Sequence, residues 1–129
     1  MIAVKDLKLA HREIIKPINK GRFIGNYKCH VNSLSYAKSN IDKCSKILGC
    51  AQVFSDGVVV AHFVVKLKNG DIIDPTYGNV SENMYSYLIV IESYNIDTFN
   101  PTRELTELKL YLYSRLPWYK KLFTNKNNI

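Results

Sequence analysis

The sequence of 129 residues has no apolar run of the roughly 18–20 residues that a membrane-spanning helix requires, so we expect no membrane association. Residues 1–16 alternate charged and apolar side chains and lack a small-residue cleavage site, which argues against a secretory signal and favours a cytoplasmic location. Hydrophobic residues make up 47% and charged residues 22%, an ordinary usage that excludes general disorder. The length predicts one compact domain over residues 1–129, because domains commonly hold about 100–150 residues.

Cysteine is also scarce: there are three residues, an odd number, and no Cys-x-x-Cys pair. This pattern argues against a disulfide framework and fits a reducing compartment. The spacing of the cysteines and histidines matches no zinc pattern, and adjacent Cys29 and His30 are poorly suited to share one tetrahedral ion. We therefore predict neither a metal site nor a cofactor. The residues concerned are Cys29, Cys44, Cys50, His11, His30 and His62.

Positive charge is abundant and is concentrated at the two ends. Residues 1–28 hold seven Lys or Arg against two Asp or Glu, residues 29–102 hold five against seven, and residues 103–129 hold six against two. If the ends meet in space, they form a cationic face that would attract nucleic acid or an acidic protein. The alternative is that this charge only keeps the protein soluble, and no Arg-rich run strengthens the nucleic-acid interpretation.

The N-terminal part predicts two helices. In residues 3–16 the apolar side chains recur on one helical stripe until Pro17, which predicts an amphipathic first helix. Residues 18–28 contain two glycines and are typical of a loop. Residues 29–40 predict a second helix, with Cys29 in its first turn.

The C-terminal part predicts a longer helix. Asn100 and Pro101 suit an N-cap and a first helical turn, and leucines then recur at helical spacing until Pro117. Residues 118–123 are predicted to form a final packed turn, and we expect the polar tail after them to fray.

The middle of the chain is rich in β-forming residues. Residues 47–54, 58–67 and 71–74 are separated by Ser-Asp-Gly and Asn-Gly, which predicts a three-stranded meander. Residues 87–91 predict a further strand. Together with the helices, these strands predict the α+β fold class with a small antiparallel sheet.

Three residues stand in the order expected of a cysteine nucleophile site: Cys29 at a helix start, His62 in a strand and Asp74 on the next strand. A thiol attacks as the thiolate, and a helix N-terminus with a nearby imidazolium lowers its pKa. The histidine must accept and return a proton, and a carboxylate on its other ring nitrogen holds it in place. Taken singly, Cys29 also fits a buried small hydrophobe and His62 an ordinary strand histidine.

The register of the hairpin after His62 decides whether it can meet Asp74. A two-residue Asn69-Gly70 turn would place the two side chains on opposite faces of the sheet. A three-residue loop, Lys68 to Gly70, with Gly70 in the left-handed conformation, places them on one face as diagonal neighbours. The second register also collects apolar residues on the other face, so we predict that one.

Two stretches carry a family resemblance: residues 28–33, Lys-Cys-His-Val-Asn-Ser, and residues 61–76, which run from Ala-His-Phe to Asp-Pro-Thr. They resemble the transglutaminase-like and papain-like cysteine hydrolase superfamily, including small phage-type members. The resemblance implies a Cys-bearing helix packed on a small antiparallel sheet in a papain-like or transglutaminase-like core. It also implies that Cys29 is the nucleophile, His62 the base and then the acid, and Asp74 the residue that orients the histidine.

The sequence departs from this family beside the nucleophile, where His30 replaces a small residue or Trp, and it shows no obvious Gln for an oxyanion hole. Asn26, Gln52 or the backbone amide of Cys29 are candidates for that role, because the oxyanion requires donors and no particular residue type. Asn32, one turn along the helix from Cys29, is a further candidate, although a structural tie to the preceding loop suits it better.

The predicted activity is thiol-dependent acyl transfer on a protein or peptide substrate: peptide hydrolysis, deamidation or crosslinking. Aromatic residues such as Tyr77, Tyr85 and Tyr87, or the basic ends, would select the substrate. The alternative is a basic, non-catalytic binding or inhibitor protein that keeps a hydrolase-like scaffold and acts on a protein or nucleic-acid partner.

Overall fold

The computed structural model of the protein describes residues 1–9, 12–126 and 129. Within these residues the fold is α+β, with a small antiparallel sheet of six strands and four α-helices. The strand order is β1-β4-β3-β6-β2, and β5 pairs with β4 outside this path. The strands are β1 (Ile2–Ala3), β2 (Ile14–Ile15), β3 (Cys44–Val53), β4 (Val58–Leu67), β5 (Ile72–Ile73) and β6 (Tyr87–Tyr94).

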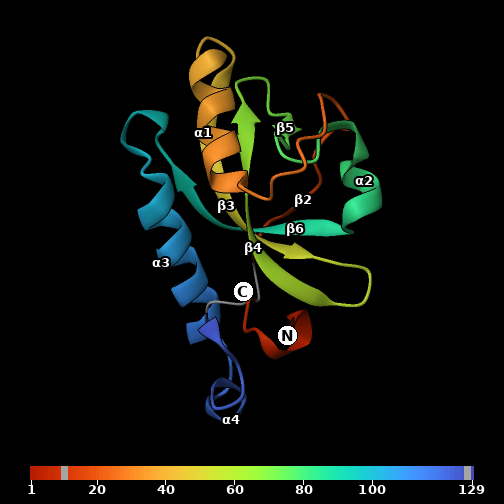
Figure 1. Ribbon diagram of the computed structural model, residues 1–129, viewed down its shortest axis with the longest axis vertical. Coiled ribbons are helices and arrows are strands. Elements are labelled where there is room, and N and C mark those ends of the chain that lie inside the picture. Colours follow the sequence, from red (N-terminus) through yellow and green to blue (C-terminus); the bar gives the residue numbers. More distant parts are fainter. Residues whose placement is uncertain (10–11, 127–128) are drawn as a thin grey trace.

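The helices are distributed unevenly around the sheet. Figure 1 shows the two long helices, α1 and α3, side by side at one side of the molecule, whereas α2 lies at the other side. The helices are α1 (Cys29–Ser39), α2 (Ser81–Met84), α3 (Pro101–Ser114) and α4 (Trp118–Lys121), and 3-10 turns lie at Val4–Asp6, Gly78–Val80 and Ile96–Thr98.

The two faces of the central strands serve two hydrophobic clusters. On β4, Phe63 and Val65 belong to the cluster that includes residues of α1 and α3, and Val64 belongs to the second cluster. Successive side chains of a strand point to opposite faces, so His62 shares the face of Val64. Its partner on β3, Cys50, is also in the second cluster.

Most of the predicted elements are confirmed. Helix α1 begins at Cys29, and strands β3, β4, β5 and β6 overlap the predicted β-rich segments, although β3 already begins at Cys44 and β6 continues to Tyr94. Helix α3 begins after Asn100, whose side-chain oxygen accepts a hydrogen bond of 3.1 Å from the backbone N–H of Arg103. Pro101 occupies the first turn of that helix, where a missing N–H leaves no bond unmade.

The predicted helix over residues 3–16 is wrong. Ile2 and Ala3 pair with β4, and Ile14 and Ile15 pair with β6, so this segment covers both long edges of the sheet. Between them only Val4–Asp6 form a 3-10 turn, and Ala10 and His11 lie outside the described residues. Edge strands leave unpaired N–H and C=O groups, and satisfying these outweighs a weak local preference for helix.

The predicted packing of the C-terminal residues is also wrong. Trp118 is 74% exposed and Phe123 is 89% exposed, so the turn at α4 does not pack on the core. Leu116 is the last buried residue before Pro117 redirects the chain. The final residue, Ile129, is buried in the hydrophobic cluster, so the expected fraying is wrong for this residue, and residues 127–128 lie outside the described residues.

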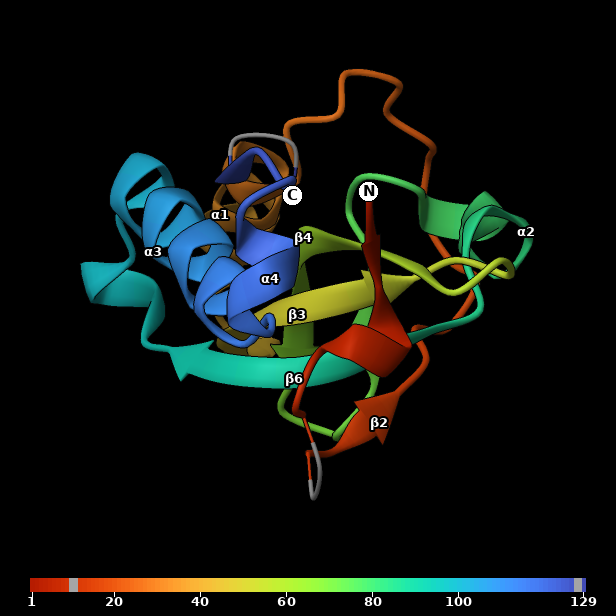
Figure 2. The same ribbon diagram turned by 90° about the horizontal axis from the view of Figure 1, so that it is seen from below.

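The two basic ends of the chain meet, as Figure 2 shows around α4 and the N-terminal segment. The Arg115 guanidinium donates hydrogen bonds of 3.0 and 2.8 Å to the backbone oxygen of Lys8. Lys120 lies 3.8 Å from the carboxylate of Asp6. None of the helices in the described part of the chain is long and apolar enough to cross a bilayer.

Candidate active site

The hairpin of β4 and β5 has the register of the three-residue loop. Lys66 pairs with Ile72, and the backbone N–H of Leu67 donates to the oxygen of Asp71 at 2.8 Å. Gly70 closes the loop with a φ of +95°, a conformation that glycine adopts without steric cost. His62 and Asp74 therefore project from the same face, as this register predicts.

The side chains of His62 and Asp74 are in contact and almost completely buried. The Nε2 atom of His62 lies 2.8 Å from Oδ2 of Asp74, and the exposed fractions are 3% and 0%. The other carboxylate oxygen, Oδ1, accepts hydrogen bonds of 3.0 Å from the backbone N–H groups of Thr76 and Tyr77. The Tyr85 hydroxyl donates to Oδ2 at 2.6 Å.

These contacts keep the carboxylate ionised in a buried site. Burial disfavours its charged form, but the His62 charge and hydrogen bond, the Tyr85 hydroxyl and the backbone donors hold the pKa of Asp74 below its usual value. For His62, burial disfavours the imidazolium, and the charge and hydrogen bond of Asp74 with the neighbouring Cys29 raise the pKa to about 10. The histidine is thus charged at neutral pH.

Cys29 is the first residue of α1 and is 7% exposed. Burial raises the pKa of its thiol, but hydrogen bonds with the His30 and His62 side chains, the charge of His62 and a backbone hydrogen bond at Phe63 outweigh burial. The result is a pKa lowered from 9.0 to about 6. Because Nε2 of His62 faces Asp74, its Nδ1 is the ring nitrogen left for the sulfur. The directions of the two pKa shifts are therefore those that favour a thiolate at Cys29 and an imidazolium at His62.

The other two cysteines have the opposite electrostatics. Cys44 and Cys50 are buried free thiols on β3, and burial raises the pKa of each. For Cys50, the negative charges of Asp74 and Cys29 add to this rise. Of the three thiols, Cys29 alone has a lowered pKa.

Two tyrosines expected to select substrate lie inside the protein instead. Tyr77 and Tyr85 are buried, and their ring centroids lie 5.5 and 5.7 Å from that of His62. Tyr85 supports Asp74 through its hydroxyl, a role that its sequence position does not indicate. Tyr87 is half-buried on β6, where it pairs with Val53.

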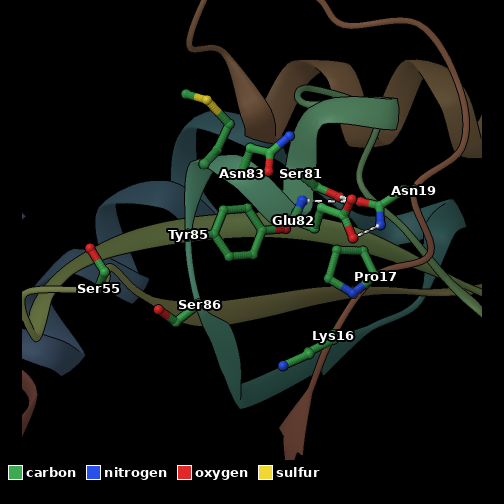
Figure 3. A pocket seen from close by; sticks show the side chains of 10 residues that line it. Lys16, Pro17, Asn19, Ser55, Ser81, Glu82, Asn83, Tyr85 and Ser86 are labelled. Atoms are coloured by element: carbon green, nitrogen blue, oxygen red, sulfur yellow. Dashed lines mark hydrogen bonds between the residues drawn. The ribbon is translucent and has the colours of Figure 1, made fainter.

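The cavity in Figure 3, of about 400 Å³, has Tyr85 in its wall but none of the residues Cys29, His62 and Asp74. Asn19 lies in its wall: its side-chain oxygen accepts from the Ser81 hydroxyl at 2.8 Å, and its side-chain nitrogen donates to Glu82 at 2.7 Å. The cavity therefore borders Tyr85, which holds the Asp74 carboxylate, and does not open onto the Cys29 sulfur.

The three side chains suggested for an oxyanion hole differ in availability. Asn32 donates to Oδ1 of Asn26 at 2.9 Å and to the Thr76 hydroxyl at 3.0 Å, so both of its N–H groups are used. Asn26 donates to Oδ1 of Asn32 at 3.3 Å, and the pair ties the preceding loop to α1. Gln52 is buried on β3, where its side chain lies near the Tyr77 hydroxyl, and its Nε2 makes no hydrogen bond of ordinary geometry within the described residues.

His30 is, after Tyr85, a second residue whose contribution sequence reasoning missed. Its imidazole is half-buried and helps to lower the pKa of the adjacent Cys29 thiol. Direct adjacency to a candidate nucleophile was the available signal, but adjacency alone does not tell which way a ring points.

Comparisons of the chain with family models, with curated proteins and with solved structures find no match. Within residues 1–9, 12–126 and 129, no group of three or more His, Cys, Asp and Glu side chains is arranged to hold a metal ion.

Proposed function

We propose that this protein is a thiol-dependent acyl-transfer enzyme with a papain-like or transglutaminase-like core and a triad of Cys29, His62 and Asp74. The observation that carries the proposal is the buried contact between His62 and Asp74, whose Nε2 and Oδ2 atoms lie 2.8 Å apart, beside a Cys29 thiol whose pKa is lowered. Such activation is what a cysteine nucleophile requires near neutral pH. A free thiolate needs a reducing environment, so we propose the cytoplasm as its location.

The reaction would proceed in two steps. The Cys29 sulfur forms a bond to the carbonyl carbon of an amide, and the resulting oxyanion collapses as the carbon–nitrogen bond breaks. His62 gives its proton to the leaving amine, which leaves a thioester on the enzyme. Water or a second amine then attacks the thioester and gives a proton back to His62, and the thiolate is released.

An oxyanion requires donors that are already in place. The Nε2 atom of Gln52 is a buried donor that makes no hydrogen bond of ordinary geometry among the described residues. On β3, Gln52 follows Cys50, the partner of His62, by two positions and so lies on the same face. We therefore propose Gln52 with the backbone N–H of Cys29 as the donors, and a structural role for Asn26 and Asn32. A buried amide without a hydrogen-bond partner costs stability, and such groups are often found at functional sites.

The experiment is to trap the acyl-enzyme. The purified protein is mixed with an activated ester, p-nitrophenyl acetate, and the mass of each cysteine-containing peptide is followed with time. Acetylation of Cys29 that later decays supports the proposal. Cys29→Ala should abolish this signal, His62→Ala should slow it, and Cys44→Ala should leave it unchanged.

A second candidate function is a non-catalytic binding protein, favoured by the meeting of the basic ends at Lys8 and Arg115. In that case, Cys29 would be acetylated by p-nitrophenyl acetate no faster than Cys44 or Cys50. The protein would instead bind an acidic protein or nucleic acid, with an affinity that falls steeply with added salt.

A further inference from the structure

The loop before Cys29, residues 16–28 and here called the rim loop, is attached on both sides of the triad. Its Asn26 side chain bonds to Asn32 of α1. Tyr27, two residues before Cys29, has a φ of +57°, a conformation that is uncommon for a residue other than glycine. Three backbone hydrogen bonds of 2.8–3.0 Å attach the loop to the segment that carries Asp74: Ile18 to Ile72, Ile24 to Thr76 and Asn79 to Gly21.

Two aromatic rings connect the rim loop with the His62 imidazole. Phe23 stacks on Tyr77 with ring centroids 6.1 Å apart, and Tyr77 lies 5.5 Å from His62. Gly78 lets the backbones approach closely, because a Cβ atom there would lie 2.6 Å from the oxygen of Gly21. The backbone of the rim loop is therefore packed against the segment that carries Asp74, and Lys20 and Arg22 line one cavity of about 310 Å³ together with Asp74.

The charged side chains of the rim loop are all positive. The sequence has no Asp or Glu between Glu13 and Asp42, and the rim loop holds four cations. The only carboxylate hydrogen-bonded to the loop in the described structure is that of Glu82, at Asn19. None of the four cations forms a salt bridge within the described residues. They are Lys16, Lys20, Arg22 and Lys28, all exposed.

We propose that the rim loop selects acyl donors with a negative charge next to the reacting carbonyl, such as peptides with Asp or Glu beside the cleaved amide. This inference rests on the proposed function, because it assigns a substrate class to the same thiol. Exposed cations without acidic partners raise the local concentration of anions. A single close cation and anion in water attract enough to change a rate about fivefold.

The first test uses the thiol itself and needs no substrate. Cys29 is alkylated with iodoacetate, an anion, and with iodoacetamide, its neutral analogue, at low salt and neutral pH. The ratio of the two rates is compared between the wild type and the Lys20→Gln/Arg22→Gln variant. We expect the ratio to fall at least about fivefold in the variant, and to fall in the wild type when salt is raised to about 1 M.

The matched control is the Lys109→Gln/Lys126→Gln variant, which removes the same charge from α3 and the C-terminal segment. Its rate ratio should stay at the wild-type value. The comparison of variants is essential, because the His62 imidazolium also attracts iodoacetate and is common to all three proteins.

The second test uses acyl donors in pairs. Fluorogenic peptide amides that differ only by Glu or Lys beside the scissile bond are compared by kcat/KM, and we expect the Glu peptide to be preferred at least about fivefold. In Arg22→Glu, the preference should shift toward the Lys peptide. A thiol that reacts selectively but shows no dependence on rim charge overturns this inference alone. If Cys29 reacts no faster than Cys44 with either reagent, the proposed function fails as well.

Discussion

Replacing Asp74 by Asn tests the coupling within the triad most directly, because the change removes a charge and keeps the size of the side chain. A carboxylate about 4 Å from an imidazolium stabilises it by about 4 kcal/mol at the effective dielectric constant of a protein site. This corresponds to about three pKa units, in line with the rise of the His62 pKa from 6.5 to about 10. Without it, the pKa of His62 should fall by about three units, so that the imidazolium no longer predominates at neutral pH.

The loss of the imidazolium should then be visible at Cys29. With a pKa of about 6, the thiol is about 90% ionised at about pH 7, whereas at its ordinary value of 9.0 it is about 1% ionised. We expect the pKa of Cys29 in Asp74→Asn to return toward 9.0 or above, since burial also raises it. The thiolate population at neutral pH should fall by up to about ninetyfold.

The assay is a pH titration of the thiolate ultraviolet absorbance, with the Cys29→Ser variant subtracted as the baseline. Wild-type protein should gain one thiolate centred near pH 6, and Asp74→Asn should not gain it until the pH is alkaline. A thiolate that still titrates near pH 6 in Asp74→Asn would refute the coupling of Asp74 to Cys29 through His62. The helix start and His30 would then account for the lowered pKa without Asp74.

Three further measurements follow from the structure. Tyr85→Phe removes the 2.6 Å hydrogen bond to the triad carboxylate and should lower the free energy of unfolding in urea by about 1.5–3 kcal/mol; an unchanged value would contradict that role. Gly70→Ala and Gly78→Ala both place a side chain at positive φ, at a cost of about 1–2 kcal/mol, but only Gly78→Ala also brings a Cβ atom to 2.6 Å from a backbone oxygen. It should therefore destabilise clearly more than its control, and equal losses in thermal unfolding would be inconsistent with the tight approach. In the wild type, the lowered pKa of Cys29 contributes stability that is present above pH 9.0 and is lost as the pH falls through about 6. The raised pKa of His62 contributes stability that is present below pH 6.5 and is lost as the pH rises through about 10. The two pH dependences of the unfolding free energy cancel between pH 6.5 and 9.0 in the wild type. In Cys29→Ser, the unfolding free energy should instead fall with rising pH over this range, by up to about 1.4 kcal/mol per pH unit. Parallel curves for the two proteins would count against the ion pair.

Local signals predicted the elements in which short-range and long-range preferences agree. The Asn100-Pro101 start of α3 needs only neighbouring residues, because its capping hydrogen bond spans three positions. The segment over residues 3–16 shows the limit of such signals. Its apolar spacing suits a helix, but the exposed edges of β4 and β6, which are formed by distant residues, pair with its two ends instead.

The sequence by itself determined the hairpin that presents His62 and Asp74 on one face, because side chains alternate along strands and Gly70 permits the left-handed turn that sets the register. Only the tertiary structure decided that Cys29 lies close enough to His62 for each to shift the pKa of the other, and that Tyr85 donates to the carboxylate. These contacts join residues from separate elements, and their geometry depends on how α1 and the segment after β5 pack on the sheet. No local pattern carries that information, since packing is set by the shapes of all the elements together.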